Sequence, residues 1–166
     1  MARAPPERSS KGDVMAVDMK KVSRGILEEA FGKGKLEYLD QICDASFKGH
    51  DPLMGELDLA GFKRLIETMR GAFPDLTPSL VAICAEGDSV CTYWRCVGTH
   101  QKALMGAAPT GKRITVEGMT FDRFRNGKLV ESTSQWDALG LLQGVGLLPK
   151  IELRPQQTET ERRPHA

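Results

Sequence analysis

The sequence predicts one α+β domain in which helices come first along the chain and a run of antiparallel strands follows. Two observations indicate this. Between residues 18 and 73 the apolar side chains recur at the spacing of an amphipathic helix, whereas residues 77–136 contain β-branched and aromatic segments separated by turns. The length of 166 residues is also typical of one domain. Helices that precede a run of strands pack together on one face of the sheet.

Three helices are expected in the first half of the chain. The first covers residues 18–31, where Asp18 can cap it and apolar side chains form a stripe at helical spacing. The second covers residues 36–42, and the third covers residues 59–73, where a Pro-Asp pair stops it. Between these last two helices, residues 45–52 predict a short strand and a turn.

Four strands are expected in the second half, over residues 77–86, 89–100, 113–124 and 128–136. Gly87-Asp88 and Asn126-Gly127 are turn signals, and the second is typical of a tight hairpin. A loop over residues 101–112 joins the two central strands. A short helix is expected after Asp137, whose carboxylate can cap it.

Composition and charge argue against several classes of protein. Lys and Arg total 23 and Asp and Glu total 22, so the formal net charge of +1 does not favour a nucleic-acid binder. No apolar run approaches the roughly 18 residues that a membrane span needs. We expect residues 17–153 to form the domain and residues 1–16 to be a disordered arm without the apolar core of a signal peptide. Residues 154–166 are expected to be a disordered tail, and the predicted location is the cytoplasm.

The distribution of cysteines and histidines predicts neither a metal site nor a cofactor. The four cysteines are Cys43, Cys84, Cys91 and Cys96. They form no C-x-x-C pair, so we expect reduced and mostly buried thiols. Cys91 and Cys96 are five residues apart on one predicted strand and should face opposite sides of it. His50 and His100 lack the spacing of metal ligands, and no glycine-rich loop has the spacing of a nucleotide site.

Five short motifs occur in order along the chain: Ala72-Phe73-Pro74-Asp75-Leu76, Gly98-Thr99-His100, Gly106-x-x-Pro109-Thr110-Gly111-Lys112, Asn126-Gly127-Lys128-Leu129-Val130-Glu131, and Trp136-Asp137-x-Leu139-Gly140-Leu141-Leu142. In this combination the chain resembles the SnoaL-like polyketide cyclase family over about residues 18–146. The resemblance implies the cone-shaped α+β fold that the family shares with ketosteroid isomerase and nuclear transport factor proteins. In that fold a curved antiparallel sheet wraps around N-terminal helices and leaves a deep apolar pocket. The resemblance also implies a homodimer formed through the outer face of the sheet.

One stretch departs from the family pattern at a catalytic position. The common pattern G-K-I-x-E-H-W-D ends in an aspartate that acts as acid and base in an intramolecular aldol closure. The corresponding stretch here is residues 127–134, in which Ser132 replaces the histidine and Ser134 replaces the aspartate. A serine hydroxyl cannot act as a general base near neutral pH without an activator. The family's catalytic role is therefore not transferred to Ser134.

Strand alternation predicts which side chains face the pocket. The inward set on the strands is Trp94, Cys96, His100, Val116, Thr120, Asp122, Phe124, Val130, Ser132, Ser134 and Trp136, and the third helix adds Leu65, Met69 and Phe73. The predicted substrate-binding residues among them are Trp94, Cys96, His100, Thr120, Ser132, Ser134, Trp136, Phe73 and Met69.

Two residues are predicted to transfer protons. Asp122 lies in mid-strand among apolar neighbours, where burial would raise the pKa of its carboxyl group. His50 precedes Asp51-Pro52 at the expected pocket mouth, where it can polarise a carbonyl group. The alternatives for Asp122 are a salt bridge to Arg95, Arg123 or Arg125, or a solvated position at the end of the strand. The alternative for both His50 and His100 is a structural hydrogen bond.

Three functions remain open. The favoured one, by analogy with the family, is a polyketide cyclase or ester cyclase-type enzyme of secondary metabolism. It would cyclise, isomerise or dehydrate a hydrophobic small molecule by proton transfer without a cofactor. The second is a non-catalytic binding or dimerisation module, which the serine at position 134 favours. The third is an epoxide hydrolase-like enzyme on the same fold, for which Arg95 and Asp122 supply only part of the carboxylate–arginine–carboxylate arrangement.

Overall fold

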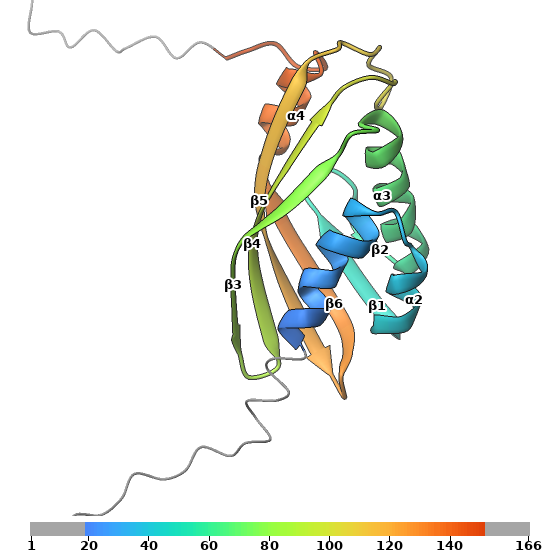
Figure 1. The fold of residues 1–166 in the computed structure, drawn as a ribbon, viewed down its shortest axis with the longest axis vertical. Helices are drawn as coiled ribbons and strands as arrows, with labels where there is room; N and C mark the ends of the chain where they lie inside the picture. Colours follow the sequence, from blue (N-terminus) through green and yellow to red (C-terminus); the bar gives the residue numbers. More distant parts are fainter. Residues whose placement is uncertain (1–18, 152–166) are drawn as a thin grey trace, which may run out of the picture.

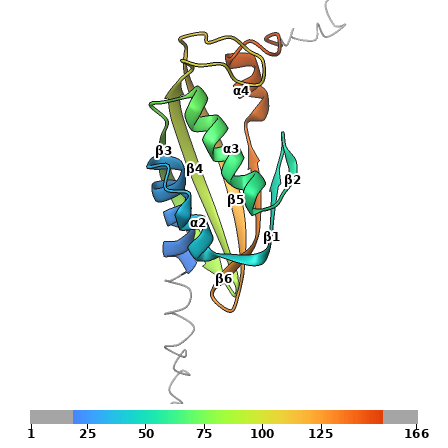
Figure 2. The ribbon, with the colours of Figure 1, turned by 90° about the vertical axis from the view of Figure 1, so that its right-hand side faces the viewer.

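The computed structural model of the protein describes residues 19–151, so the predicted arm (1–16) and tail (154–166) lie outside the described residues. Six strands form one curved, open sheet in the order β2-β1-β6-β5-β4-β3, and the helices cover one of its faces (Figure 1). In the view turned by 90°, α3 lies across the strands (Figure 2). The predicted α+β fold class is confirmed. No helix within residues 19–151 is both long and apolar enough to cross a membrane.

The helical part begins with an unexpected change of geometry. Residues 19–25 are α-helical, but the chain then widens into a π-helix, η1 (Ile26–Gly32), before the short helix α2 (Glu37–Ile42). A guanidinium nitrogen of Arg70 donates hydrogen bonds to the carbonyl groups of Phe31 and Gly32 at the end of η1. These bonds satisfy carbonyl groups that a helix end leaves without partners.

The other two helices begin as their sequences predict. Helix α3 (Leu59–Ala72) starts at Asp58, whose carboxylate accepts the N–H of Gly61 at 2.6 Å. Helix α4 (Ala138–Gly144) starts at Asp137, whose carboxylate accepts the N–H of Gly140 at 2.8 Å. Both are N-caps of the usual kind, and the predicted cap at Asp137 is confirmed.

The strands are β1 (Cys43–Asp51), β2 (Gly55–Leu57), β3 (Thr77–Glu86), β4 (Ser89–Thr99), β5 (Arg113–Arg125) and β6 (Lys128–Trp136). The bounds of β3 and β6 are those predicted, and β4 and β5 each differ by one residue. The sequence did not predict that β1 and β2 form a hairpin, nor that β1 pairs with β6 in parallel. The sheet is therefore antiparallel except at this one pair, where His50 lies opposite Thr133.

A β-bulge in β6 makes Val130 face a different side from the one predicted. Arg123 pairs with Glu131 and Phe124 pairs with Leu129, so Val130 is the extra residue between them. Leu129 is consequently fully buried in the core, and Val130 lies with Glu131 and Lys48 along a groove outside the main cavity. The prediction that Val130 faces inward is wrong, because alternation along the strand is interrupted at the bulge.

We expect the glycine at position 118 to be required where two tryptophan side chains converge. A Cβ added at Gly118 would collide with the Trp136 side chain and would lie 2.7 Å from the Trp94 ring. Gly118→Ala should therefore lower the free energy of unfolding by about 1–3 kcal/mol, measured by urea denaturation.

The matched control is Gly71→Ala in α3, where an added Cβ meets nothing within 4 Å. This change should raise the free energy of unfolding by about 0.5–1 kcal/mol, because alanine is the better helix former. Equal stability of Gly118→Ala and the unaltered protein would contradict the packing described here.

Candidate active site

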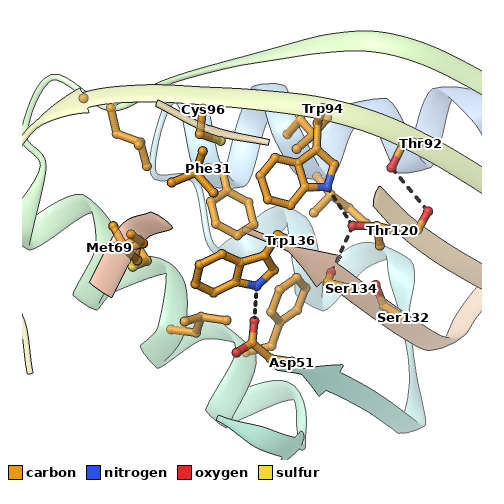
Figure 3. Close-up of a pocket in the computed structure, with 18 of the residues that line it drawn as sticks. Phe31, Asp51, Met69, Thr92, Trp94, Cys96, Thr120, Ser132, Ser134 and Trp136 are labelled. Atoms are coloured by element: carbon orange, nitrogen blue, oxygen red, sulfur yellow. Dashed lines mark hydrogen bonds between the residues drawn. The ribbon is translucent and has the colours of Figure 1, made fainter. Parts of the chain in front are cut away.

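A cavity of about 100 Å³ lies between the sheet and the helices η1 and α3 (Figure 3). Most of its lining is apolar, and the aromatic members come from η1, α3, β4 and β6 and from the residue that follows α3. They are Phe31, Phe62, Phe73, Trp94 and Trp136. The volume is enough for several water molecules or a small organic group. Polar side chains enter this apolar space at a few places only, which is the usual composition of a small-molecule site.

Nine of the eleven predicted site residues line this cavity. They are Asp122, Trp94, Cys96, Thr120, Ser132, Ser134, Trp136, Phe73 and Met69. Strand alternation brings the residues of β4, β5 and β6 to the same face of the sheet, and α3 supplies Met69 while Phe73 follows its last residue. The other two predicted residues, His50 and His100, are not among the lining residues.

His50 lies on the opposite face of its strand from the cavity. Its Nε2 atom is 3.9 Å from a carboxylate oxygen of Glu131, and its side chain is about one third exposed. The next residue, Asp51, lines the cavity instead, because neighbouring residues of a strand face opposite sides. The position of His50 gives no support to the predicted catalytic role, which we do not carry further.

His100 is fully buried beside the cavity and holds the following loop in place. Its Nδ1 atom accepts the backbone N–H of Thr110 at 3.3 Å, and its ring packs against Phe73 with 5.4 Å between the ring centroids. Its backbone also exchanges hydrogen bonds with Gly111 and Lys112. This geometry matches the alternative interpretation of His100 as a packing and hydrogen-bonding residue.

The carboxylate of Asp122 is the most deeply buried acidic group that the cavity contains. Only 1% of the residue is exposed. One oxygen accepts the hydroxyl of Ser23 at 2.6 Å, and the other accepts the hydroxyl of Ser132 at 2.7 Å. Burial raises the pKa of Asp122 above its ordinary value, and the two serine hydrogen bonds act in the opposite direction.

The salt bridges considered for Asp122 do not form within the described residues. Each of the three arginines pairs with another carboxylate: Arg123 with Glu131 at 3.4 Å, Arg95 with Glu117 at 2.6 Å, and Arg125 with Asp44 at 3.9 Å. All three guanidinium side chains are more than half exposed, and no arginine is among the cavity residues. Among residues 19–151, Asp122 therefore has hydroxyl partners but no cationic partner, and none of these residues supplies the cavity with the arginine needed for epoxide hydrolase-like chemistry.

A second polar group in the cavity has a spare proton. The indole N–H of Trp94 donates to the hydroxyl of Thr120 at 2.9 Å, and that hydroxyl lies 2.9 Å from the hydroxyl of Ser134. Three protons are available from these groups, and the two hydrogen bonds use two of them. One hydroxyl proton of the Thr120–Ser134 pair is therefore left to donate to an oxygen atom of a bound molecule.

Asp51 and Ser23 are site residues that the sequence analysis did not select. Asp51 accepts the indole N–H of Trp136 at 2.9 Å and also accepts two backbone N–H groups of its own turn, so it orients the Trp136 ring. Asp51 could have been found from strand alternation, because it is two residues after Gly49 and residues two apart on a strand face the same side. The signal for Ser23 was a polar residue inside the apolar stripe of the first helix.

Within residues 19–151, no group of His, Cys, Asp and Glu is arranged to hold a metal ion.

Comparison with known proteins gives one consistent result. The family model of the SnoaL-like polyketide cyclases matches residues 21–145. AclR, a proposed hydroxylase from Streptomyces galilaeus, is 27% identical; the match covers 82% of this chain and 86% of AclR, with a TM-score of 0.73. A proposed polyketide cyclase from Acidithiobacillus ferrooxidans is 30% identical, with coverage of 77% and 94% and a TM-score of 0.65. IdmH, a proposed polyketide cyclase from Streptomyces antibioticus, is 27% identical, with coverage of 76% and 96% and a TM-score of 0.65. No curated protein matches the chain.

The raised pKa of Asp122 predicts a specific dependence of stability on pH. The folded protein holds this proton more tightly than the unfolded chain, so the contribution of Asp122 is fully present below about pH 4, the ordinary aspartate value. It is lost as the pH rises through the raised pKa, with a slope of at most about 1.4 kcal/mol per pH unit. In Asp122→Asn the site cannot titrate.

The measurement is the free energy of unfolding of both proteins by urea denaturation from pH 4 to pH 8. Subtracting the two curves cancels the surface carboxylates, whose pKa values are lowered and act in the opposite direction, such as Asp75 and Glu117. We expect the unaltered protein to lose stability relative to Asp122→Asn as the pH rises. A difference that is flat, or that grows in the opposite direction, would rule out a raised pKa.

Proposed function

The chain belongs to the SnoaL-like polyketide cyclase family, and from this premise we propose that it is an enzyme that transfers protons on a hydrophobic carbonyl compound without a cofactor. The reaction class is aldol-type cyclisation, isomerisation or dehydration. The observation that carries the proposal is the buried Asp122 carboxyl group in the cavity lining, which has two serine partners and no cationic partner within residues 19–151.

In the proposed reaction Asp122 acts as both base and acid. Its carboxylate takes a proton from the carbon next to a substrate carbonyl, and the C–H electron pair moves to form an enolate. In an aldol closure the enolate carbon then bonds to a second carbonyl carbon, and Asp122 returns the proton to the new alkoxide. A pKa raised by burial suits both steps, because proton transfer is most efficient when the pKa lies near the working pH.

The hydroxyl pair of Thr120 and Ser134 supplies the second requirement, a donor for the enolate oxygen. Its spare proton faces the same cavity as Asp122, and the indole N–H of Trp94 fixes the orientation of Thr120. A donor held in place before the reaction stabilises developing negative charge without reorganisation. Ser134 would thus bind an oxygen atom where the family pattern has an acid, while the acid of this chain lies on the neighbouring strand β5.

A non-catalytic binding module is the second candidate function. Ser134 favours it, because the aspartate of the family pattern is missing from that position. The apolar lining would then hold a hydrophobic molecule, and Asp122 would serve only as a buried hydrogen-bond acceptor for Ser23 and Ser132. The two functions differ in one observable, which is the exchange of protons on a bound ketone.

We expect the protein to accelerate exchange of α-carbon protons with deuterium from D₂O in small hydrophobic ketones, followed by NMR. Asp122→Asn should lose about 10²–10⁴-fold of this rate, the usual contribution of a general acid or base. Ketone binding, measured separately by ligand-observed NMR, should persist in this variant. His50→Ala is the control and should keep the full rate, because His50 faces away from the cavity. Ketones that bind without any accelerated exchange would favour the binding module.

We also propose a homodimer formed through the outer face of the sheet. Met119 and Phe121 on β5 alternate with the cavity residues, and these two apolar side chains are 54% and 45% exposed. Exposed neighbouring apolar residues of this kind favour a protein interface.

Native mass spectrometry should therefore show a dimer, and Phe121→Asp should convert it to a monomer. Met54→Asp, at an equally exposed position on the β1–β2 turn, should leave the dimer intact; a monomeric unaltered protein would contradict the proposal.

A further inference from the structure

Two of the four cysteines lie directly opposite each other on neighbouring strands. Cys84 on β3 and Cys91 on β4 are register partners in the antiparallel hairpin that ends the sheet at one edge (Figure 1). The Sγ atom of Cys84 is 3.8 Å from the carbonyl oxygen of Cys91. Directly opposed residues have Cα atoms about 4.5–5.5 Å apart, and a disulfide spans Cα separations of about 4.4–6.8 Å. The hairpin thus holds both thiols within reach of a disulfide bond.

The environment distinguishes this pair from the other two thiols. Cys84 is exposed and Cys91 is partly exposed, on the face of the sheet opposite the cavity. Cys43 and Cys96 lie deeper, and burial raises the pKa of each thiol to about 12. A thiol with such a pKa forms almost no reactive thiolate near neutral pH. Cys96 also has Pro78 and Val116 as its strand neighbours, so it has no cysteine partner.

We propose that Cys84 and Cys91 form a site of reversible oxidation, at which a low-molecular-weight disulfide of the glutathione class converts the two thiols into a disulfide bond. The site is separate from the cavity and does not depend on the function proposed above. Cys84, as the more exposed thiol, begins the exchange.

The proposed oxidation takes place in two steps of thiol–disulfide exchange. The Cys84 thiolate attacks one sulfur of the small disulfide, so that a mixed disulfide forms and one small thiolate leaves. The Cys91 thiolate then attacks the Cys84 sulfur, and the second small thiolate leaves. The two protein thiols are oxidised, the small disulfide is reduced to two thiols, and the two protein protons pass to the leaving groups. Burial raises the pKa of the Cys91 thiol, which lowers its thiolate fraction near neutral pH.

The position of the pair gives the oxidation a structural consequence. Cys84 lies on β3, a sheet-edge strand, which pairs with β4 alone among the described strands. The inward side of β4 presents Thr92 and Trp94 to the cavity. A disulfide between positions 84 and 91 would close the end of this hairpin and resist separation of β3 from the strand that carries the cavity residues.

The sequence allows a direct test by peptide mass spectrometry. Cleavage after Lys and Arg leaves Cys84 and Cys91 together in the peptide of residues 71–95, whereas Cys43 and Cys96 fall in residues 36–48 and 96–102. The full-length reduced protein is incubated with oxidised glutathione, unfolded, alkylated with iodoacetamide and digested. We expect the peptide 71–95 to be unalkylated and lighter by two hydrogen atoms than its reduced form, and both other peptides to be alkylated. Dithiothreitol should restore the two thiols.

Two matched variants identify the partners. In Cys91→Ser, Cys84 should stop at the mixed disulfide and carry one glutathione. In Cys84→Ser, Cys91 should remain largely alkylated, because it is less exposed. The proposal is overturned if the unaltered peptide 71–95 is alkylated twice, if it stops at a mixed disulfide, or if a non-reducing gel shows that two chains have been linked through these cysteines.

Discussion

The buried carboxyl group of Asp122 imposes the strictest requirement on this structure. An ionised carboxylate in an apolar cavity costs several kcal/mol unless hydrogen-bond donors reach it. Here the donors are two hydroxyl groups that are distant in the sequence, Ser23 on the first helix and Ser132 on β6. Each donates a hydrogen bond to one oxygen of the Asp122 carboxyl group. The helix must therefore stay docked on the concave face of the sheet, and β6 must stay in register with β5. All three residues line the cavity.

This requirement also explains how the chain can depart from its family's pattern. Thr120 lies opposite Ser134, and Asp122 lies opposite Ser132, so the two polar groups are neighbours on the same face of one strand pair. The hydroxyl pair has a proton to donate, and the carboxyl group can take a proton and return it. In the proposed reaction, Asp122 carries out the acid–base chemistry and the Thr120–Ser134 pair stabilises the oxyanion, with both groups facing one apolar cavity.

Much of the fold and most of the site follow from strand alternation, and the failures have local physical causes. The strands β3 and β6 were predictable because their period is two and Gly87-Asp88 and Asn126-Gly127 mark the turns. Asp122 was predictable because an acid is unusual among inward-facing aromatic and aliphatic residues. The bulge at Val130 was not, since nothing in the local pattern marks the extra residue. The orientation of His50 could not be predicted, because the side on which β1 presents each residue depends on its pairing with β6, a contact distant in the sequence.

The most direct test of this account is the pKa of Asp122 itself, from the pH dependence of its side-chain ¹³C chemical shift in the protein without ligand. The account predicts a midpoint above the ordinary aspartate value of about 3.9, and a still higher midpoint in Ser132→Ala, because that serine favours the ionised form. A midpoint at or below the ordinary value would show that the carboxylate is well solvated or paired with a cation. The proposed acid–base role would then lose its physical basis.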